Sequence, residues 1–264
     1  MTIREIIGQS SIDRIDTELI LTHVLKKSRS WLLAHDEEES SLQQKNQCMR
    51  LFKRRQNKEP LAYIICSKEF YGREFYVTKD VLIPRPATEG LIDLTLGFLK
   101  KPERRIVKLD AGIIGIAKPF NPSTRQPCIV DIGTGSGCIA ITLALEGCTQ
   151  KIIGVDISKK AREVAEKNRK KFGTKNVHFV VQDGIEFVGS MKQPFLLVSN
   201  PPYVASGTTL EKTVVEFEPH GALFAGKDGM DIIRPLLKAA KGNKKCIGVI
   251  LEMTSDMLHS CRNC

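Results

Sequence analysis

Two polar segments could carry chemistry, and the first is rich in glycine. VDIGTGSGCIA (130–140) places Gly133, Gly135 and Gly137 between an apolar run and a helical pattern. Glycines in such a turn let a ligand approach the backbone and receive the first N–H groups of the helix. Cys138 stands where a dinucleotide-binding G-x-G-x-x-G motif needs glycine, which argues against NAD. A tight turn that binds nothing is the alternative.

The second segment is VSNPPYVAS (198–206), in which Asn200, Pro201, Pro202 and Tyr203 follow another apolar run. Each proline removes a backbone donor and fixes φ, so a pair of prolines cannot continue a helix or a central strand. The segment therefore predicts a stiff turn that carries an amide and an aromatic ring.

An alternation of strands and helices must position both segments. Strand patterns at 128–132, 151–156, 177–181, 195–199 and 246–253 are separated by helical patterns at 137–147, 158–172 and 230–241. This order predicts an α/β fold with a parallel sheet wound by right-handed crossovers. The carboxyl ends of neighbouring strands meet at one edge of such a sheet, where ligands bind.

Three further residues fall at this edge. Asp156 ends the second strand, where a carboxylate can accept hydrogen bonds from both hydroxyls of a ribose. Asp156 could instead cap the next helix, a role for which Ser158 competes. Asp183 and Gly184 end the third strand, a position suited to contact with an adenine, and a simple turn is the alternative.

The remaining chain divides into three parts. Residues 1–58 show helical periodicity and predict a small helical domain, and 59–90 contain aromatic and β-branched runs around Gly72 that predict a β-hairpin linker. Residues 91–264 hold the strand–helix alternation and form the predicted catalytic domain. Within them, the pattern of 101–127, rich in Pro, Lys and Arg, indicates no element.

Composition limits the classes of protein. The 264 residues are 42% hydrophobic and 27% charged, and no apolar run is long enough to span a membrane. The N-terminus lacks the pattern of a secretory signal, so the cytoplasm is expected. We expect no metal, because the C-x-x-C at 261–264 has no second Cys or His pair nearby. The net charge of +10 allows an acidic partner, although basic helix faces are usually just solvated.

The glycine loop, Asp156 and the NPPY turn together resemble the class I S-adenosylmethionine-dependent methyltransferases, in the subgroup that methylates a planar NH2 group. Such a nitrogen is a poor nucleophile because its lone pair is delocalised. The Asn200 side-chain oxygen and the Pro201 carbonyl can accept its two N–H bonds and orient the lone pair, while Tyr203 packs the flat group. Pro202 helps to hold the acceptors in place.

Segments 54–89 and 218–231, with DRIDTELILTHVL near the start, resemble the HemK/PrmC family of protein-(glutamine-N5) methyltransferases. The resemblance implies methylation of the glutamine in the GGQ motif of class-1 peptide chain release factors, docked with help from the helical domain. The resemblance assigns the substrate pocket to Pro201, Pro202 and Tyr203. It also implies that Asn200 contacts both the glutamine and S-adenosylmethionine. The residues assigned to the cofactor are Gly133, Thr134, Gly135, Ser136, Gly137, Asp156 and Gly184, to which the strand pattern adds Asp183.

Three features depart from the family. Ala87 in PRPATE replaces a usually acidic residue, 101–127 is long, and the chain stops where members continue through a final antiparallel hairpin. We therefore expect a sheet without its last two strands and with an exposed edge. The alternatives are a methyltransferase for a ribosomal-protein glutamine, one for nucleic acid, and an inactive binder of release factors. No nucleic acid is expected to be required, and a monomer is the default.

Overall fold

The structure is a computed structural model that describes residues 1–100, 106–109, 112–117, 126–254 and 257. It divides into two compact units. The first, here called the helical unit, comprises Met1–Ser67 and Glu211–Phe217; the second, the sheet unit, comprises Lys68–Leu210 and Glu218–Cys264.

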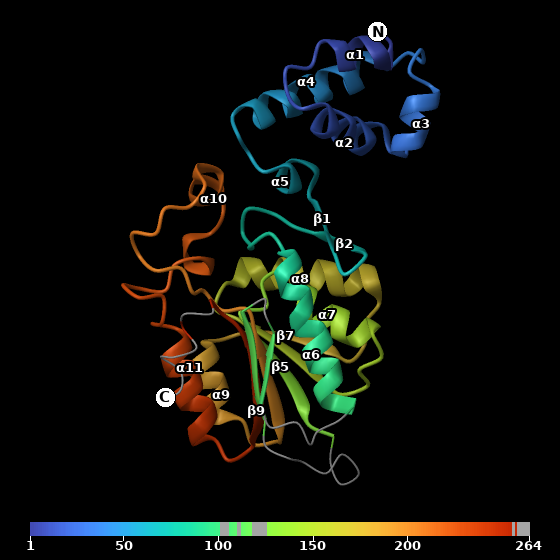
Figure 1. Ribbon diagram of the computed structural model, residues 1–264. Helices are drawn as coiled ribbons and strands as arrows, with labels where there is room; N and C mark the ends of the chain where they lie inside the picture. Colours follow the sequence, from blue (N-terminus) through green and yellow to red (C-terminus); the bar gives the residue numbers. More distant parts are fainter. Residues whose placement is uncertain (101–105, 110–111, 118–125, 255–256, 258–264) are drawn as a thin grey trace. The chain divides into compact units, whose positions relative to one another are not determined.

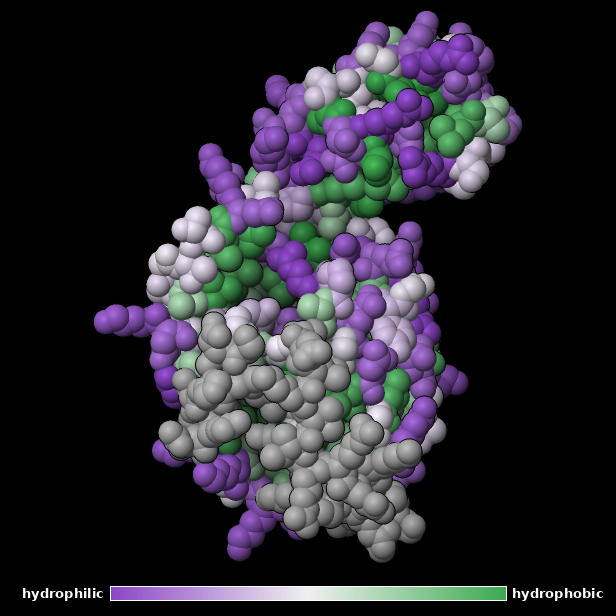
Figure 2. All heavy atoms as spheres, in the orientation of Figure 1, coloured by the Kyte–Doolittle hydropathy of each residue, from purple (hydrophilic) through white to green (hydrophobic). Residues whose placement is uncertain are grey.

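The helical unit consists of helices, and those within residues 1–65 contribute to an apolar core of its own. Thr2 with Glu5, and Ser41 with Gln44, form capping boxes that start two of them. Figure 2 shows polar side chains over much of this unit, with apolar ones between them. The helices are α1 (Ile3–Gly8), α2 (Arg14–Leu25), α3 (Arg29–Ala34), α4 (Leu42–Gln56), α5 (Leu61–Ile65) and α10 (Lys212–Phe217).

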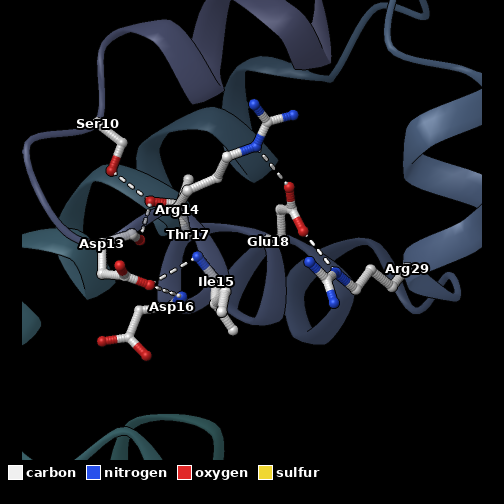
Figure 3. Close-up of polar contacts among 8 residues, drawn as sticks. All are labelled: Ser10, Asp13, Arg14, Ile15, Asp16, Thr17, Glu18 and Arg29. Atoms are coloured by element: carbon white, nitrogen blue, oxygen red, sulfur yellow. Dashed lines mark hydrogen bonds and ion pairs between the residues drawn. The ribbon is translucent and has the colours of Figure 1, made fainter.

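A buried carboxylate joins two of these helices (Figure 3). Asp13 caps α2, and one turn later Glu18 is only 1% exposed. Glu18 accepts a hydrogen bond from Arg14 at 2.9 Å and from Arg29, which begins α3, at 2.5 Å. These two guanidinium groups hold the pKa of Glu18 below its usual value despite burial. The pairing therefore fixes α3 against α2.

The hairpin predicted around Gly72 is present in the linker. Strands β1 (Ser67–Phe70) and β2 (Arg73–Tyr76) pair, and the two turn residues Tyr71 and Gly72 both have positive φ, 52° and 70°. Two positive φ values are typical of the tight turns that match strand twist. The linker's first part differs from the expectation, because 61–65 form helix α5. After the hairpin come a 3₁₀ helix, η1 (Pro86–Thr88), and α6 (Glu89–Lys100).

Apart from the β1–β2 hairpin, the described strands form one seven-stranded sheet in the order β3-β4-β9-β8-β5-β6-β7. The five strands predicted from the sequence are present, and they pair in parallel with one another. The bounds are β3 Ile106–Leu109, β4 Ile113–Ala117, β5 Cys128–Ile132, β6 Ile152–Asp156, β7 Val177–Val181, β8 Phe195–Ser199 and β9 Cys246–Glu252.

The expectation of a sheet with an exposed edge beside its last parallel strand is wrong. β4 pairs antiparallel with β9, from Ile113 opposite Glu252 to Ala117 opposite Gly248, and β3 pairs antiparallel with β4. Both strands come from the segment 101–127, for which the sequence indicated no element. Part of that segment lies outside the described residues. An earlier part of the chain thus supplies the two antiparallel strands that the expectation placed after β9.

Helices cover both faces of the sheet (Figure 1). α6, α7 (Cys138–Leu145) and α8 (Lys159–Phe172) contribute to one apolar core, and α9 (Gly184–Ser190) and α11 (Ile233–Gly242) contribute to the other. Strand β8 serves both, because Phe195 and Leu197 face one core and Leu196 and Val198 the other. This period of two is that of a strand buried on both faces. The sequence analysis did not predict α9 or α10.

Candidate active site

The glycine loop joins β5 to α7 in a conformation that depends on its glycines. Gly133, Gly135 and Gly137 have φ values of 71°, 53° and 78°, a region that other residues rarely adopt. A Cβ on Gly137 would lie 2.7 Å from the Phe179 ring, whereas a Cβ on Gly133 would meet only the Asn200 carbonyl, at 3.9 Å. The loop is therefore packed at its helical end and has space at its strand end.

A buried acid, Asp131, supports this loop from β5. Its side chain is fully buried, and Oδ2 accepts a hydrogen bond from the Thr134 hydroxyl at 2.6 Å. Burial raises the pKa of Asp131 to about 7, and the Thr134 hydroxyl and the Ala140 N–H oppose this rise. Oδ1 has no hydrogen-bond partner among the described residues. The sequence analysis did not single out Asp131, since it lies inside the strand.

Asp156 lies at the carboxyl end of β6 and reaches back to the glycine loop. Its Oδ2 accepts from the Gly135 N–H and its Oδ1 from the Ser158 N–H, each at 2.9 Å. Ser158 caps α8, so the capping role that Asp156 could have taken is filled. Burial raises the pKa of Asp156 against the opposing effect of these N–H groups. A carboxylate has about four acceptor sites, so capacity remains for further donors.

Asp183 and Gly184 lie just after β7, where helix α9 begins. Asp183 caps α9 by accepting from the N–H groups of Ile185 and Glu186, each at 2.9 Å. A Cβ on Gly184 would lie 2.5 Å from the Ile132 side chain, so this close approach of α9 to β5 requires glycine. The sequence analysis considered a simple turn and a ligand contact for these residues. In the structure, Asp183 caps α9 and also lines a cavity.

The NPPY turn follows β8, and contacts from distant segments fix its two polar side chains. Asn200 Nδ2 donates to Thr88 Oγ1 at 2.9 Å, and the Tyr203 hydroxyl donates to Glu252 Oε1 at 3.1 Å. Burial and the neighbouring Glu252 carboxyl raise the pKa of Tyr203 to about 12. The tyrosine is therefore a neutral donor at ordinary pH.

A second buried carboxylate anchors the residues before η1. Glu218 is 4% exposed, and it accepts from Arg85 at 2.6 Å and from the Ile83 N–H at 3.1 Å. These contacts hold the PRPATE segment beside the chain that follows the NPPY turn. The sequence analysis did not predict the contacts of Arg85 with Glu218, of Thr88 with Asn200 or of Glu252 with Tyr203, because the two partners of each pair are far apart in the chain.

A cavity of about 310 Å³ opens at this edge of the sheet, within the range of small-ligand sites. Ile157, on its wall, is 75% exposed although apolar, and the sequence analysis did not single it out. Of the residues predicted to form the site, those that line the cavity are Gly133, Gly135, Asp156, Asp183, Gly184, Asn200, Pro201 and Pro202. Thr134, Ser136, Gly137 and Tyr203 are not among the described residues that line it.

Two other expectations concern metal and membrane. The described residues contain no group of His, Cys, Asp or Glu side chains that could hold a metal ion, and the C-x-x-C at 261–264 lies outside them. Within the same residues, no helix has the length and apolar character that crossing a bilayer requires.

Comparisons with known proteins match both units. Residues 4–65 match the family described as PrmC N-terminal domain, and residues 125–200 match the one described as Methyltransferase domain. A release factor glutamine methyltransferase of Koribacter versatilis is 36% identical over 225 residues, 84% of this chain and 72% of that protein. One of Bordetella pertussis is 33% identical over 242 residues, 91% of this chain and 81% of that protein.

A third relative is longer. The bifunctional methyltransferase of Rickettsia felis is 36% identical over 260 residues, 94% of this chain but 48% of that protein, so the chain spans about half its length. The fold is that of the class I S-adenosylmethionine-dependent methyltransferases, a Rossmann-like sheet with a small helical N-terminal unit. On the strength of the first two relatives, the chain belongs to the release factor glutamine methyltransferase family.

Proposed function

We propose that this protein transfers a methyl group from S-adenosylmethionine to the side-chain amide N5 of the glutamine in the GGQ motif of class-1 peptide chain release factors. The observation that carries the proposal is the orientation of the Asn200 amide. Its nitrogen donates to Thr88, and its oxygen accepts no hydrogen bond from the described residues. That oxygen is therefore available to an incoming NH2 group. Membership of the family supports the choice of substrate.

The residues at the cavity fit the proposed cofactor. When bound, S-adenosylmethionine supplies a methyl group on a positively charged sulfur. We assign its ribose to Asp156, whose carboxylate has acceptor capacity left, and its adenine to the side of the cavity lined by Asp183 and Gly184. Ile157 offers an exposed apolar side chain beside Asp156 that a flat base would cover. The space at Gly133 leaves room for the rest of the molecule.

The chain's own residues then prepare the glutamine nitrogen. Asn200 Oδ1 and the Pro201 carbonyl accept its two N–H bonds and direct its lone pair toward the methyl group. The nitrogen gains the methyl group as the methyl–sulfur bond breaks and the sulfonium becomes a neutral thioether, and it loses one proton to water, so the product is a neutral secondary amide. Pro201 and Pro202 fix the backbone of these acceptors, and Tyr203 is held by Glu252.

The test is transfer of labelled methyl to a purified release factor, beside the same factor with its GGQ glutamine replaced. We expect label on the unmodified factor alone. A ribosomal protein fraction and RNA are included as competing acceptors, and label on either in place of the release factor would refute the proposal. Absence of label on every acceptor, with cofactor still bound, would leave a binding protein and would also refute it.

The role of Asn200 has its own test. Asn200→Ala should lower turnover by at least ~10²-fold, the scale of removing one preorganised polar group at a reacting centre. Cofactor affinity should change little, because Asp156 and the glycine loop remain. Turnover close to that of the wild type would remove Asn200 from the mechanism.

A further inference from the structure

A hydroxyl and a carboxyl lie buried beside the NPPY turn, where each bonds one of its side chains, and the mechanism above gives the hydroxyl no task. Thr88, in η1, and Glu252, at the end of β9, are each 2% exposed. Asn200 Nδ2 donates to the Thr88 hydroxyl oxygen at 2.9 Å, across 112 positions of the sequence. Glu252 accepts from the Tyr203 hydroxyl with Oε1.

The directions of these hydrogen bonds follow from what each group can do. The Thr88 hydroxyl has one proton, and because its oxygen accepts from Asn200, that proton needs another acceptor. Glu252 Oε2 is buried and makes no hydrogen bond of normal geometry to any described residue. The Thr88 hydroxyl nevertheless lowers the pKa of this carboxyl, opposing the larger rise that burial causes. Glu252, whose Oε2 has no other donor among the described residues, is the carboxyl that would take the Thr88 proton.

An asparagine amide has nearly the same shape when its oxygen and nitrogen exchange places, so packing alone cannot choose between the two orientations. The choice decides the chemistry. With its oxygen outward, the Asn200 amide can accept a hydrogen bond from a substrate NH2 group. With its nitrogen outward, its own NH2 group would face the substrate NH2 group, and neither could accept. With its proton directed to Glu252, the Thr88 hydroxyl can only accept from Asn200, and this is the orientation in the structure, where Nδ2 donates to Thr88.

We infer that Thr88 and Glu252 are positioning residues that hold the Asn200 amide with its oxygen toward the substrate amide. The inference rests on the proposed function and deepens it. It predicts that turnover depends on the Thr88 hydroxyl, although Thr88 is buried and has no place in the substrate contacts proposed above.

The test compares Thr88→Val, which keeps the shape and removes the hydroxyl, with Thr88→Ser, which keeps the hydroxyl. Thr88→Val should lower kcat about tenfold or more, which is the effect expected when a positioned group loses one hydrogen bond. The Kd of the cofactor should change little. The kcat of Thr88→Ser should stay within about threefold of the wild-type value. Thr95→Val is the matched control, because the buried Thr95 hydroxyl has no partner among the described residues. It should leave kcat unchanged.

The result is separable from the proposed function. Equal kcat for Thr88→Val and Thr88→Ser in an enzyme that methylates release factors would overturn the inference alone. The orientation can also be read without any acceptor, from the hydrogen exchange of the Asn200 side-chain NH2 by NMR. Slow exchange in the wild type that is lost in Thr88→Val supports the inference, and identical exchange in both overturns it. Glu252→Gln, which replaces an acceptor by a donor, should speed this exchange too.

Discussion

Asp131 makes the stability of the sheet unit depend on pH in an unusual direction. Its carboxyl is fully buried, and its pKa is raised from 3.8 to about 7. Between these values the folded protein keeps a proton that the unfolded chain has lost, so folding stability falls as pH rises and levels off above 7. From pH 5 to pH 8 this group alone removes ~2.5 kcal/mol from the free energy of unfolding, by the linkage relation.

Asp131→Asn removes the titration and leaves an oxygen that can accept the Thr134 hydroxyl. Between pH 5 and pH 8 we expect the free energy of unfolding of the variant to fall by ~2.5 kcal/mol less than that of the wild type. Urea denaturation followed by circular dichroism measures it, since the single tryptophan, Trp31, lies in the helical unit. Equal losses in the two proteins would show that Asp131 is already ionised in the fold.

Two further substitutions test the cofactor edge and the loop. Asp156→Ala should weaken cofactor binding by roughly 1–3 kcal/mol, because ribose acceptors and the contact to the Gly135 N–H are lost; calorimetry measures it, and an unchanged Kd would argue against the ribose assignment. Gly137→Ala should destabilise the fold by about 2 kcal/mol or more, since its Cβ would lie 2.7 Å from the Phe179 ring at a φ of 78°. Gly173→Ala, at a φ of 68° with no atom within 4 Å, is the control for backbone strain alone, and equal destabilisation of the two variants would contradict the packing argument.

The parallel part of the fold could be predicted because its signals are local. Apolar strand patterns alternate with helical patterns over short distances, and Ser158 and Gly173 mark the two ends of α8. β3 and β4 could not be predicted in this way, since strands of four or five residues are recognised by the helical patterns between them, and no helix separates β3 from β4 or β4 from β5 among the described residues. Their pairing also depends on β9, more than a hundred residues later in the chain.

In the candidate site, too, residues marked by local sequence signals could be predicted, and residues that depend on long-range contacts could not. Asn200, Asp156 and the glycines stand directly after strands, so their position at one edge of the sheet follows from the topology alone. Thr88, Glu218 and Glu252 could not be found this way, because each acts through a partner that only the fold brings near. Glu252 ends an apolar strand, where a sequence pattern indicates the boundary of an element and gives no hint of a buried acceptor.

The place of β9 bears on the order in which the sheet can assemble during synthesis. It is the last of the described strands in the chain, yet it lies between β4 and β8 in the sheet. The four strands β5 to β8 are already contiguous when residue 199 has left the ribosome, whereas the earlier β3–β4 hairpin can join them only after residues 246–252 arrive. Glu252, which accepts from the Tyr203 hydroxyl of the NPPY turn, is supplied in the same event. The nascent chain therefore completes the described sheet and the contact that holds Tyr203 in one late step.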